Sequence, residues 1–227
     1  LHTAYRRQRQ MCIRDRAHAA ILAGFDMVVE MPTHISLQSA EYFALGSIKI
    51  LEKIGIDYLC FGIENEDPKI FLEKSRELIY RADELEALTK KNLVNSSYTK
   101  ARYDATVEIL GDKDFITSNN ILALEYLRAI DKICSNIKAI PIRRISSANK
   151  DMDLKTSRIS SSTAIRKNIY KDYKDHVPSY SYKLIEDEKD KFGFPSMDYE
   201  YGLFKFLLLI EKKPMTEIIG YEAVSYT

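Results

Sequence analysis

The sequence predicts an α/β fold in which a parallel sheet is covered by helices. Two short apolar runs, "FDMVVEMP" (residues 25–32) and "IDYLCFGIE" (56–64), are typical of buried strands. Each is followed by a stretch with helical periodicity, and strands that alternate with helices at this spacing indicate a parallel sheet. Of the 227 residues, 45% are hydrophobic, which is enough to bury a sizeable core.

The first half of the chain is assigned element by element from local pattern. Residues 17–24, "AHAAILAG", have the form of a helix end closed by glycine. The run 25–32 is predicted as a strand. Residues 36–55 form a helix by the spacing of their apolar residues, which are Ala40, Phe43, Ala44, Ile48 and Leu51.

The second half continues the alternation of helices with a strand. After the strand at 56–64 the pattern predicts helices at Pro68–Tyr80, 82–94, 98–110 and Asn119–Ile133. The run "IKAIPIRRI" (137–145) is a third strand. A polar loop follows, and a further helix starts within "RISSSTAIRK" (158–167).

Composition divides the chain into segments. Residues 17–172 form the α/β domain, 173–196 form a polar, tyrosine-rich linker, and 197–222 begin a helical domain. Residues 1–16 hold five arginines and no lysine, unlike the rest of the chain, and are predicted to be a non-native leader. Residues 223–227 are predicted to be a non-native tail.

Charge and cysteine content exclude several classes of protein. The 34 basic and 33 acidic residues nearly cancel, so overall charge does not predict a nucleic-acid binder. The longest apolar run, Leu203–Ile210, is too short to span a membrane. The three cysteines are isolated, which favours a reduced, cytoplasmic protein, and no metal-ligand spacing occurs.

Four candidate sites lie just after a strand or at the start of a helix. In an open parallel sheet, ligands bind at such positions. Gly62 ends a strand and either lets a ligand approach the backbone or is an ordinary turn glycine. Of Asn119 and Asn120, one caps a helix while the other can spare its amide for a ligand. Arg144 ends the third strand, where a guanidinium suits phosphate.

The fourth site is the hydroxyl-rich start of the helix in 158–167. A single hydroxyl is enough for a helix cap, whereas several hydroxyls beside two cations suit a phosphate. Both interpretations stay open on this pattern alone. Glu30 and Glu64, at strand ends, are either solvated carboxylates or ligands for a metal or an amine. Tyrosines at 170, 173, 180 and 182 stack on RNA or belong to a plain linker.

Five segments in this order resemble the bacterial tRNA(Met) cytidine acetate ligase family. They are "AGFDMVVEMP", "QSAEYFALGSIKILEKIGIDYLCFGIE", "SNNILALEYL", "RRIS" and "ISSSTAIRK", and the resemblance covers residues 17–222. It implies a Rossmann-like nucleotidyltransferase sheet with helices on both faces, followed by a helical domain. The last segment is also similar to a helix start that holds triphosphate in the wider nucleotidyltransferase superfamily.

The resemblance implies an ATP-dependent ligase of tRNA modification. Acetate and ATP, with Mg²⁺, would form acetyl-adenylate, and the acetyl group would pass to N4 of the wobble cytidine of elongator tRNA(Met). Matching motifs imply ATP contacts at Gly62, Asn119, Arg144 and Ile145, and phosphate contacts at Ser161, Thr163 and Arg166.

Two departures from the family pattern qualify this expectation. Ile63 stands where the family tends to have serine, and residues 1–16 contain no counterpart of the family's HxGH-type segment. No catalytic residue is therefore assigned, and the chain by itself is expected to be inactive. Two other functions stay open: an adenylyltransferase for a small phosphorylated metabolite, and a non-catalytic nucleotide- or RNA-binding module.

Overall fold

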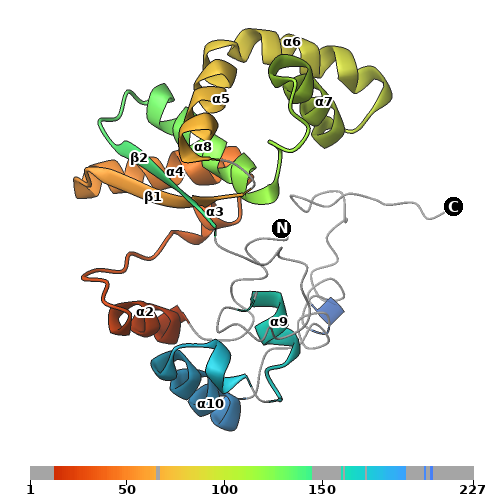
Figure 1. Cartoon of the computed structure of the whole chain (residues 1–227). Coiled ribbons are helices and arrows are strands. Elements are labelled where there is room, and N and C mark those ends of the chain that lie inside the picture. Colours follow the sequence, from red (N-terminus) through yellow and green to blue (C-terminus); the bar gives the residue numbers. More distant parts are fainter. Residues whose placement is uncertain are drawn as a thin grey trace, which may run out of the picture. The chain divides into compact units, whose positions relative to one another are not determined.

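The computed structural model describes residues 13–64, 67–144, 160, 162–171, 173–192, 202, 205 and 206. These residues belong to two compact units. One runs from Val29 to Arg144, and the other comprises the described residues before Val29 and after residue 159. Figure 1 shows the elements of both.

A parallel pair of strands forms the sheet of the first unit. Strand β1 (Tyr58–Ile63) pairs with β2 (Lys138–Arg143), and Gly62 lies opposite Ile142. Helix α8 (Ser118–Lys132) packs against β1, α5 (Pro68–Tyr80) against β2, and α4 (Ala40–Ile54) against α8 (Figure 1). The predicted α/β fold with a parallel sheet is confirmed.

Local signals set the ends of these helices. Asp67 accepts a hydrogen bond from the Lys69 backbone N–H at 2.9 Å, and Pro68 occupies the first turn of α5, where proline is favoured. Helix α4 ends at Gly55, whose φ of +83° is readily reached only by glycine. Helices α6 (Ala82–Asn92) and α7 (Tyr98–Leu110), which follow α5 in the chain, pack on each other and both contact α5.

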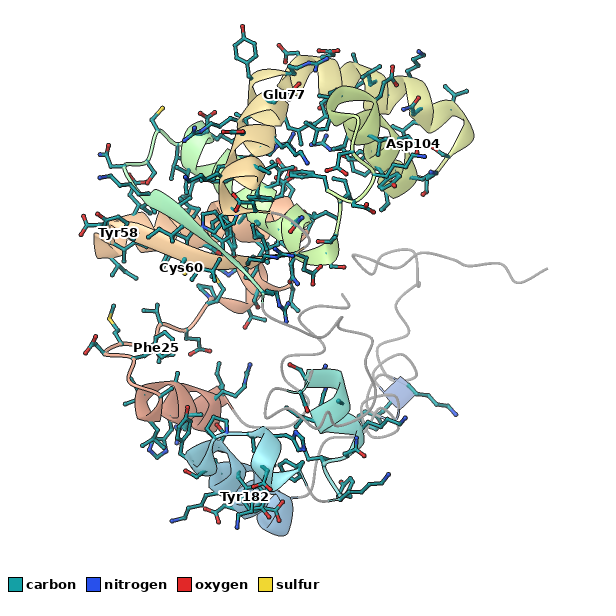
Figure 2. The ribbon with its side chains drawn as sticks, in the orientation of Figure 1. Phe25, Tyr58, Cys60, Glu77, Asp104 and Tyr182 are labelled. Carbon is teal, nitrogen blue, oxygen red and sulfur yellow. The ribbon has the colours of Figure 1, made fainter. Side chains whose placement is uncertain are left out.

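The core lies between the helices and one face of the sheet. Phe71 is fully buried and stacks on Phe115 with ring centroids 5.4 Å apart. The side chains at alternate positions of the two strands point to the other face of the sheet and are exposed. They include Tyr58 and Cys60 in β1 (Figure 2) and Ile140 and Ile142 in β2. Helices on a second face stay a prediction.

The predicted strand at residues 25–32 is wrong. The segment has no strand structure, and its apolar side chains are exposed, including Phe25 (63% exposed; Figure 2), Met27, Val28 and Val29. A strand needs a neighbour to satisfy its backbone hydrogen bonds. Among the described residues β1 and β2 pair only with each other, so an apolar run alone does not make a strand here.

The second unit contains three longer helices in its described part. These three are α2 (Ile13–Leu22), α9 (Ser162–Lys167) and α10 (Ser179–Phe192), and α2 packs against α10; a short 3-10 helix, Lys174–His176, and helical residues at 202, 205 and 206 are described besides them. Helix α2 therefore begins within the predicted leader, and α10 lies within the predicted linker. Residues 223–227, and most of 197–222, lie outside the described residues, so the domain boundaries stay predictions.

Among the described aromatic residues of the second unit, Tyr173 is the most buried. Its hydroxyl donates to Glu186 Oε1 at 2.7 Å, and its ring lies 5.2 Å from that of Tyr182. Burial raises the pKa of the Tyr173 phenol well above its usual range, and Glu186 adds to this effect. A ring that is 1% exposed cannot stack on RNA, so this tyrosine is structural.

Within the described part of the chain, no helix combines the length and apolar character needed to cross a bilayer.

Candidate functional site

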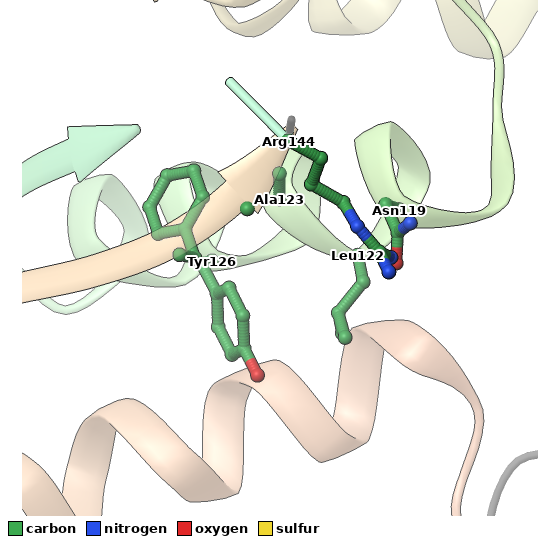
Figure 3. Close-up of a pocket in the computed structure, with 7 residues that line it drawn as sticks. Asn119, Leu122, Ala123, Tyr126 and Arg144 are labelled. Atoms are coloured by element: carbon green, nitrogen blue, oxygen red, sulfur yellow. The ribbon is translucent and has the colours of Figure 1, made fainter. Parts of the chain in front are cut away.

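A cavity of about 300 Å³ lies at the carboxyl ends of the two strands (Figure 3). It brings together Gly62, Asn119 and Arg144, three positions that the sequence suggested for ATP. Its remaining lining is mostly apolar and comprises Phe61, Leu122, Ala123 and Tyr126. Open parallel sheets hold ligands at this edge.

Gly62 makes room for Arg144. It lies inside β1 and not in a turn, and a Cβ atom added there would stand 3.2 Å from Arg144 Cγ and 3.4 Å from Cδ. The Arg144 backbone N–H donates to Ile63 O at 3.0 Å, which carries the ladder one residue beyond β2. The glycine therefore allows the arginine side chain to lie across the strand and reach the cavity.

One face of α8 supplies four of the lining residues. Asn119, Leu122, Ala123 and Tyr126 are spaced i, i+3, i+4 and i+7, so they share a face of the helix (Figure 3). The Tyr126 ring lies 5.8 Å from that of Phe61. The sequence interpretation found only Asn119, although helical spacing from that residue would have indicated the other three.

The two adjacent asparagines have different roles, and neither caps the helix as predicted. The cap is Thr117, whose hydroxyl accepts from the Asn120 backbone N–H at 3.3 Å. Asn120 is 1% exposed, and its amide accepts from the Glu64 N–H at 2.8 Å and donates to the carbonyls of Glu64 (3.0 Å) and Phe115 (2.9 Å). Asn120 is therefore structural, and Asn119 faces the cavity.

Glu64 connects the polar residues at the cavity rim. Its Oε1 accepts from Asn119 Nδ2 at 2.5 Å and lies 3.8 Å from Arg144 Nη1. The side chains of Glu64 and Arg144 are 24% and 43% exposed, so both reach solvent. The carboxylate considered as a metal or amine ligand therefore contacts two side chains of the rim.

The remaining predicted positions are not placed at this cavity. Ile145 and Ser161 lie outside the described residues, as does the side chain of Thr163. Thr163 and Arg166 belong to α9 in the second unit. Their phosphate-binding role stays a prediction.

A second cavity of about 190 Å³ in the first unit shares Tyr126 with the first. It is largely apolar, and it contains Glu30, the other strand-end carboxylate of the sequence analysis. Its remaining lining is Val29, Met31, Phe43, Ser47, Ile50, Leu51 and Leu59. In the described portion of the chain, no three His, Cys, Asp or Glu side chains gather in a way that could hold a metal ion.

The first cavity has the chemistry of a nucleotide site. Phe61, Leu122 and Tyr126 provide apolar surface for a planar base, whereas Asn119 and Arg144 provide a hydrogen-bonding amide and a positive charge. Binding sites for small molecules commonly combine an apolar wall with a few polar groups in this way.

Comparisons with known proteins agree with this chemistry. A sequence profile of the family described as HIGH Nucleotidyl Transferase matches residues 13–223. The tRNA(Met) cytidine acetate ligase of Thermosipho africanus is 39% identical over 186 residues, which cover 78% of this chain and 44% of that protein. The protein of the same name from Clostridium perfringens is 31% identical over 221 residues, covering 89% and 54%.

Solved structures show the same likeness. Crystalline Thermotoga maritima TmcAL in its apo form matches 93% of this chain and 54% of its own, with a TM-score of 0.78 and 27% identity. The same protein bound with alpha-thio ATP matches with a TM-score of 0.75 and 26% identity, covering 93% of this chain and 52% of its own. The chain spans about half the length of the curated relatives it matches. The family resemblance seen in the sequence is confirmed.

Proposed function

The chain belongs to the HIGH nucleotidyl transferase family, and we propose that it is the ATP-binding part of a ligase that acetylates tRNA. The observation that carries this proposal is the cavity at the strand ends, where Gly62, Asn119 and Arg144 meet. The Thermotoga neighbour was crystallised with an ATP analogue, which supports ATP as the ligand. Ile145, next to Arg144, belongs to the same proposed site.

In the proposed binding mode the base occupies the apolar part of the cavity. Phe61, Leu122 and Tyr126 contact the base, and Arg144 faces the phosphates. Ser161 and Thr163 are proposed to bind phosphate, because a helix start with hydroxyls favours anions. Arg166, in the last turn of α9, is proposed to add a positive charge for the phosphate.

The proposed reaction has two steps. A carboxylate oxygen of acetate attacks the α-phosphate of ATP, so that an oxygen–phosphorus bond forms, the α–β bridge breaks and pyrophosphate leaves. The N4 amine of a cytidine in tRNA(Met) then attacks the acetyl carbonyl, which releases AMP and a proton. The relatives named tRNA(Met) cytidine acetate ligase support acetate and tRNA(Met) as the substrates. Arg144 would stabilise charge on the phosphates in the first step without covalent chemistry.

Mg²⁺ is proposed to arrive with the nucleotide as MgATP. This ion is usually held by substrate phosphates and water together with one or two carboxylates. The described residues offer no larger cluster of metal-ligating side chains. The protein would work in the cytoplasm, where its tRNA substrate is found.

ATP binding is the first test of this proposal. Isothermal titration calorimetry of the chain with ATP should give a dissociation constant that Arg144→Ala weakens about tenfold or more, because hydrogen bonds to charged groups contribute about 1.5–3 kcal/mol. Arg143→Ala is the matched control, since Arg143 is also exposed but does not line the cavity. Equal loss in both variants would argue against this site.

The ligase activity needs a test in a whole protein, because the chain spans only part of its relatives. We would replace the matching 186 residues of the Thermosipho relative with those of this chain and assay the chimera with ATP, acetate and tRNA(Met) transcript. N4-acetylcytidine should form, and Arg144→Ala should abolish it. A folded chimera that releases pyrophosphate only with a phosphorylated metabolite would indicate an adenylyltransferase. One that binds ATP but never releases pyrophosphate would indicate a binding module.

A further inference from the structure

Glu64 is held in place at the cavity rim by a buried residue. Asn120 accepts from the Glu64 N–H at 2.8 Å and donates to the Glu64 carbonyl at 3.0 Å. The same amide donates to Phe115 O at 2.9 Å, which ties this contact to the core. Because both backbone groups of Glu64 are bonded to one buried side chain, the backbone at the end of β1 is fixed.

The Glu64 carboxylate in turn determines the orientation of Asn119. An ionised carboxylate can only accept hydrogen bonds, so the nitrogen of the Asn119 amide must face it. Asn119 Nδ2 lies 2.5 Å from Glu64 Oε1, in agreement with this rule. The Oδ1 atom of Asn119 is then the side of the amide available to accept a hydrogen bond from a ligand.

The same carboxylate lies beside the guanidinium of Arg144. Nη1 is 3.8 Å from Oε1, and both side chains are partly exposed. An ion pair of this kind adds little to folding stability. Its effect is to restrict a long, flexible side chain, so that less conformational freedom is lost when a ligand binds.

We propose that Glu64 is a positioning residue for the nucleotide. It orients the amide of Asn119 and holds Arg144 at the rim of the cavity, and it acts only through these two side chains. The proposal rests on the nucleotide site proposed above. It also predicts that the preferred ligand carries a hydrogen-bond donor for Asn119 Oδ1, which in ATP is either the amino group of adenine or a ribose hydroxyl.

Calorimetric titration of the chain with ATP tests the effect of the carboxylate. Glu64→Ala should weaken binding about tenfold, and Glu64→Gln, which keeps an acceptor but loses the charge, about threefold. Glu125→Gln is the matched control, because Glu125 also pairs with an arginine, Arg128, but neither member of that pair lines the cavity, whereas Arg144 does. Unchanged binding by Glu64→Ala would show that the carboxylate does not position the site, and tighter binding would show that it only repels phosphate. Either result would overturn the proposal.

A mutant cycle, in which the effect of Glu64→Ala is measured with and without its two partner side chains, separates positioning from a general effect on the fold. In a chain that already carries Asn119→Ala and Arg144→Ala, Glu64→Ala should change ATP affinity less than about twofold, since coupled residues are non-additive. A full tenfold loss in that background would overturn the proposal.

Three ATP analogues identify the group that donates to Asn119 Oδ1. ITP lacks the amino group of adenine, and 2′-deoxy-ATP and 3′-deoxy-ATP each lack one ribose hydroxyl. Only the analogue that lacks the true donor should bind as weakly to the wild-type chain as to Asn119→Ala.

An NMR measurement keeps this test independent of ATP binding. The side-chain amide of Asn119 should resonate downfield while it is bonded to the carboxylate. Glu64→Ala should abolish that shift, and Glu125→Gln should leave it unchanged. If the chain binds no ATP, the proposed function fails, and the positioning role is judged on this signal. Its persistence in Glu64→Ala overturns that role, and its loss supports it.

Discussion

At the scale of single residues, two adjacent asparagines show how position decides function. Asn119 and Asn120 have the same side chain, but only the second is buried, with three hydrogen bonds to the main chain. A buried polar group that loses its partners is costly, whereas a rim residue can exchange its partner for a ligand or water. The two therefore respond differently to substitution.

Asn120→Ala is expected to lower the free energy of unfolding by about 2–4 kcal/mol, because three main-chain groups lose their partner, and the carbonyl of Phe115 among them is buried. Asn119→Ala, the control, should cost less than about 1 kcal/mol and instead weaken ATP binding. Urea denaturation and calorimetry measure the two effects. Equal loss of stability in both variants would contradict the assigned roles.

Gly62→Ala should affect binding more than stability. The added Cβ must push Arg144 Cγ outward from 3.2 Å, so we expect ATP affinity to fall about threefold. The melting temperature should stay the same or rise slightly, because glycine in a strand is about 0.5–1 kcal/mol less favourable than alanine.

Gly111→Ala gives the opposite result and serves as the comparison. Gly111 has a φ of +67° with open space around it, so the strain is in the backbone. This variant should lose about 1 kcal/mol of stability and keep its ATP affinity. A loss of affinity here would show that ATP binding reports only on folding.

At the scale of elements, α8 links the core to the cavity. It carries the buried Asn120 and the four lining residues, and it begins at the Thr117 cap. The bounds of α5 and α7 agree with the sequence prediction because an aspartate or serine cap, followed in α7 by a closing glycine, marks them locally. Helix α10 was missed because its polar, tyrosine-rich composition resembles a linker.

Thr117→Ala should loosen the first turn of α8. Loss of an N-cap hydroxyl costs about 1 kcal/mol, and amide hydrogen exchange at residues 118–121 should become faster. Thr117→Ser, which keeps the hydroxyl, should restore the wild-type rates. If alanine and serine exchange alike, the 3.3 Å contact with the Asn120 N–H does not act as a cap.

At the scale of the whole molecule, an ion pair of the first unit connects helix α5 to the loop that follows α7. Lys74 on α5 lies 2.6 Å from Asp112 in the loop after α7. The hydrogen bond from Lys74 lowers the pKa of the Asp112 carboxyl, and the Asp114 N–H contributes further. A carboxyl whose pKa is lowered on folding stabilises the fold at pH values above its pKa in the unfolded state. This contribution is lost as the pH falls through its pKa in the folded state.

Asp112→Asn should therefore be less stable than the wild-type chain at neutral pH, by about 1 kcal/mol for a partly exposed pair. The difference should shrink as pH falls below about 4, the usual pKa of aspartate, because the wild-type carboxyl becomes protonated. Denaturation curves across this range measure it. Asp104→Asn, which breaks the more exposed pair with Lys100, should show a smaller difference.

The sequence by itself determined the parallel α/β order, the ends of α5 and α7, and three residues of the cavity. These depend on local caps, on helical periodicity and on motifs that keep their order along the chain. Only the tertiary structure decided which asparagine faces the cavity, why residue 62 is glycine, and that residues 25–32 form no strand. Those outcomes depend on what lies next to each group in space, such as Arg144 over Gly62 and Asn120 against Glu64, and neighbours far apart in the chain leave no local signal.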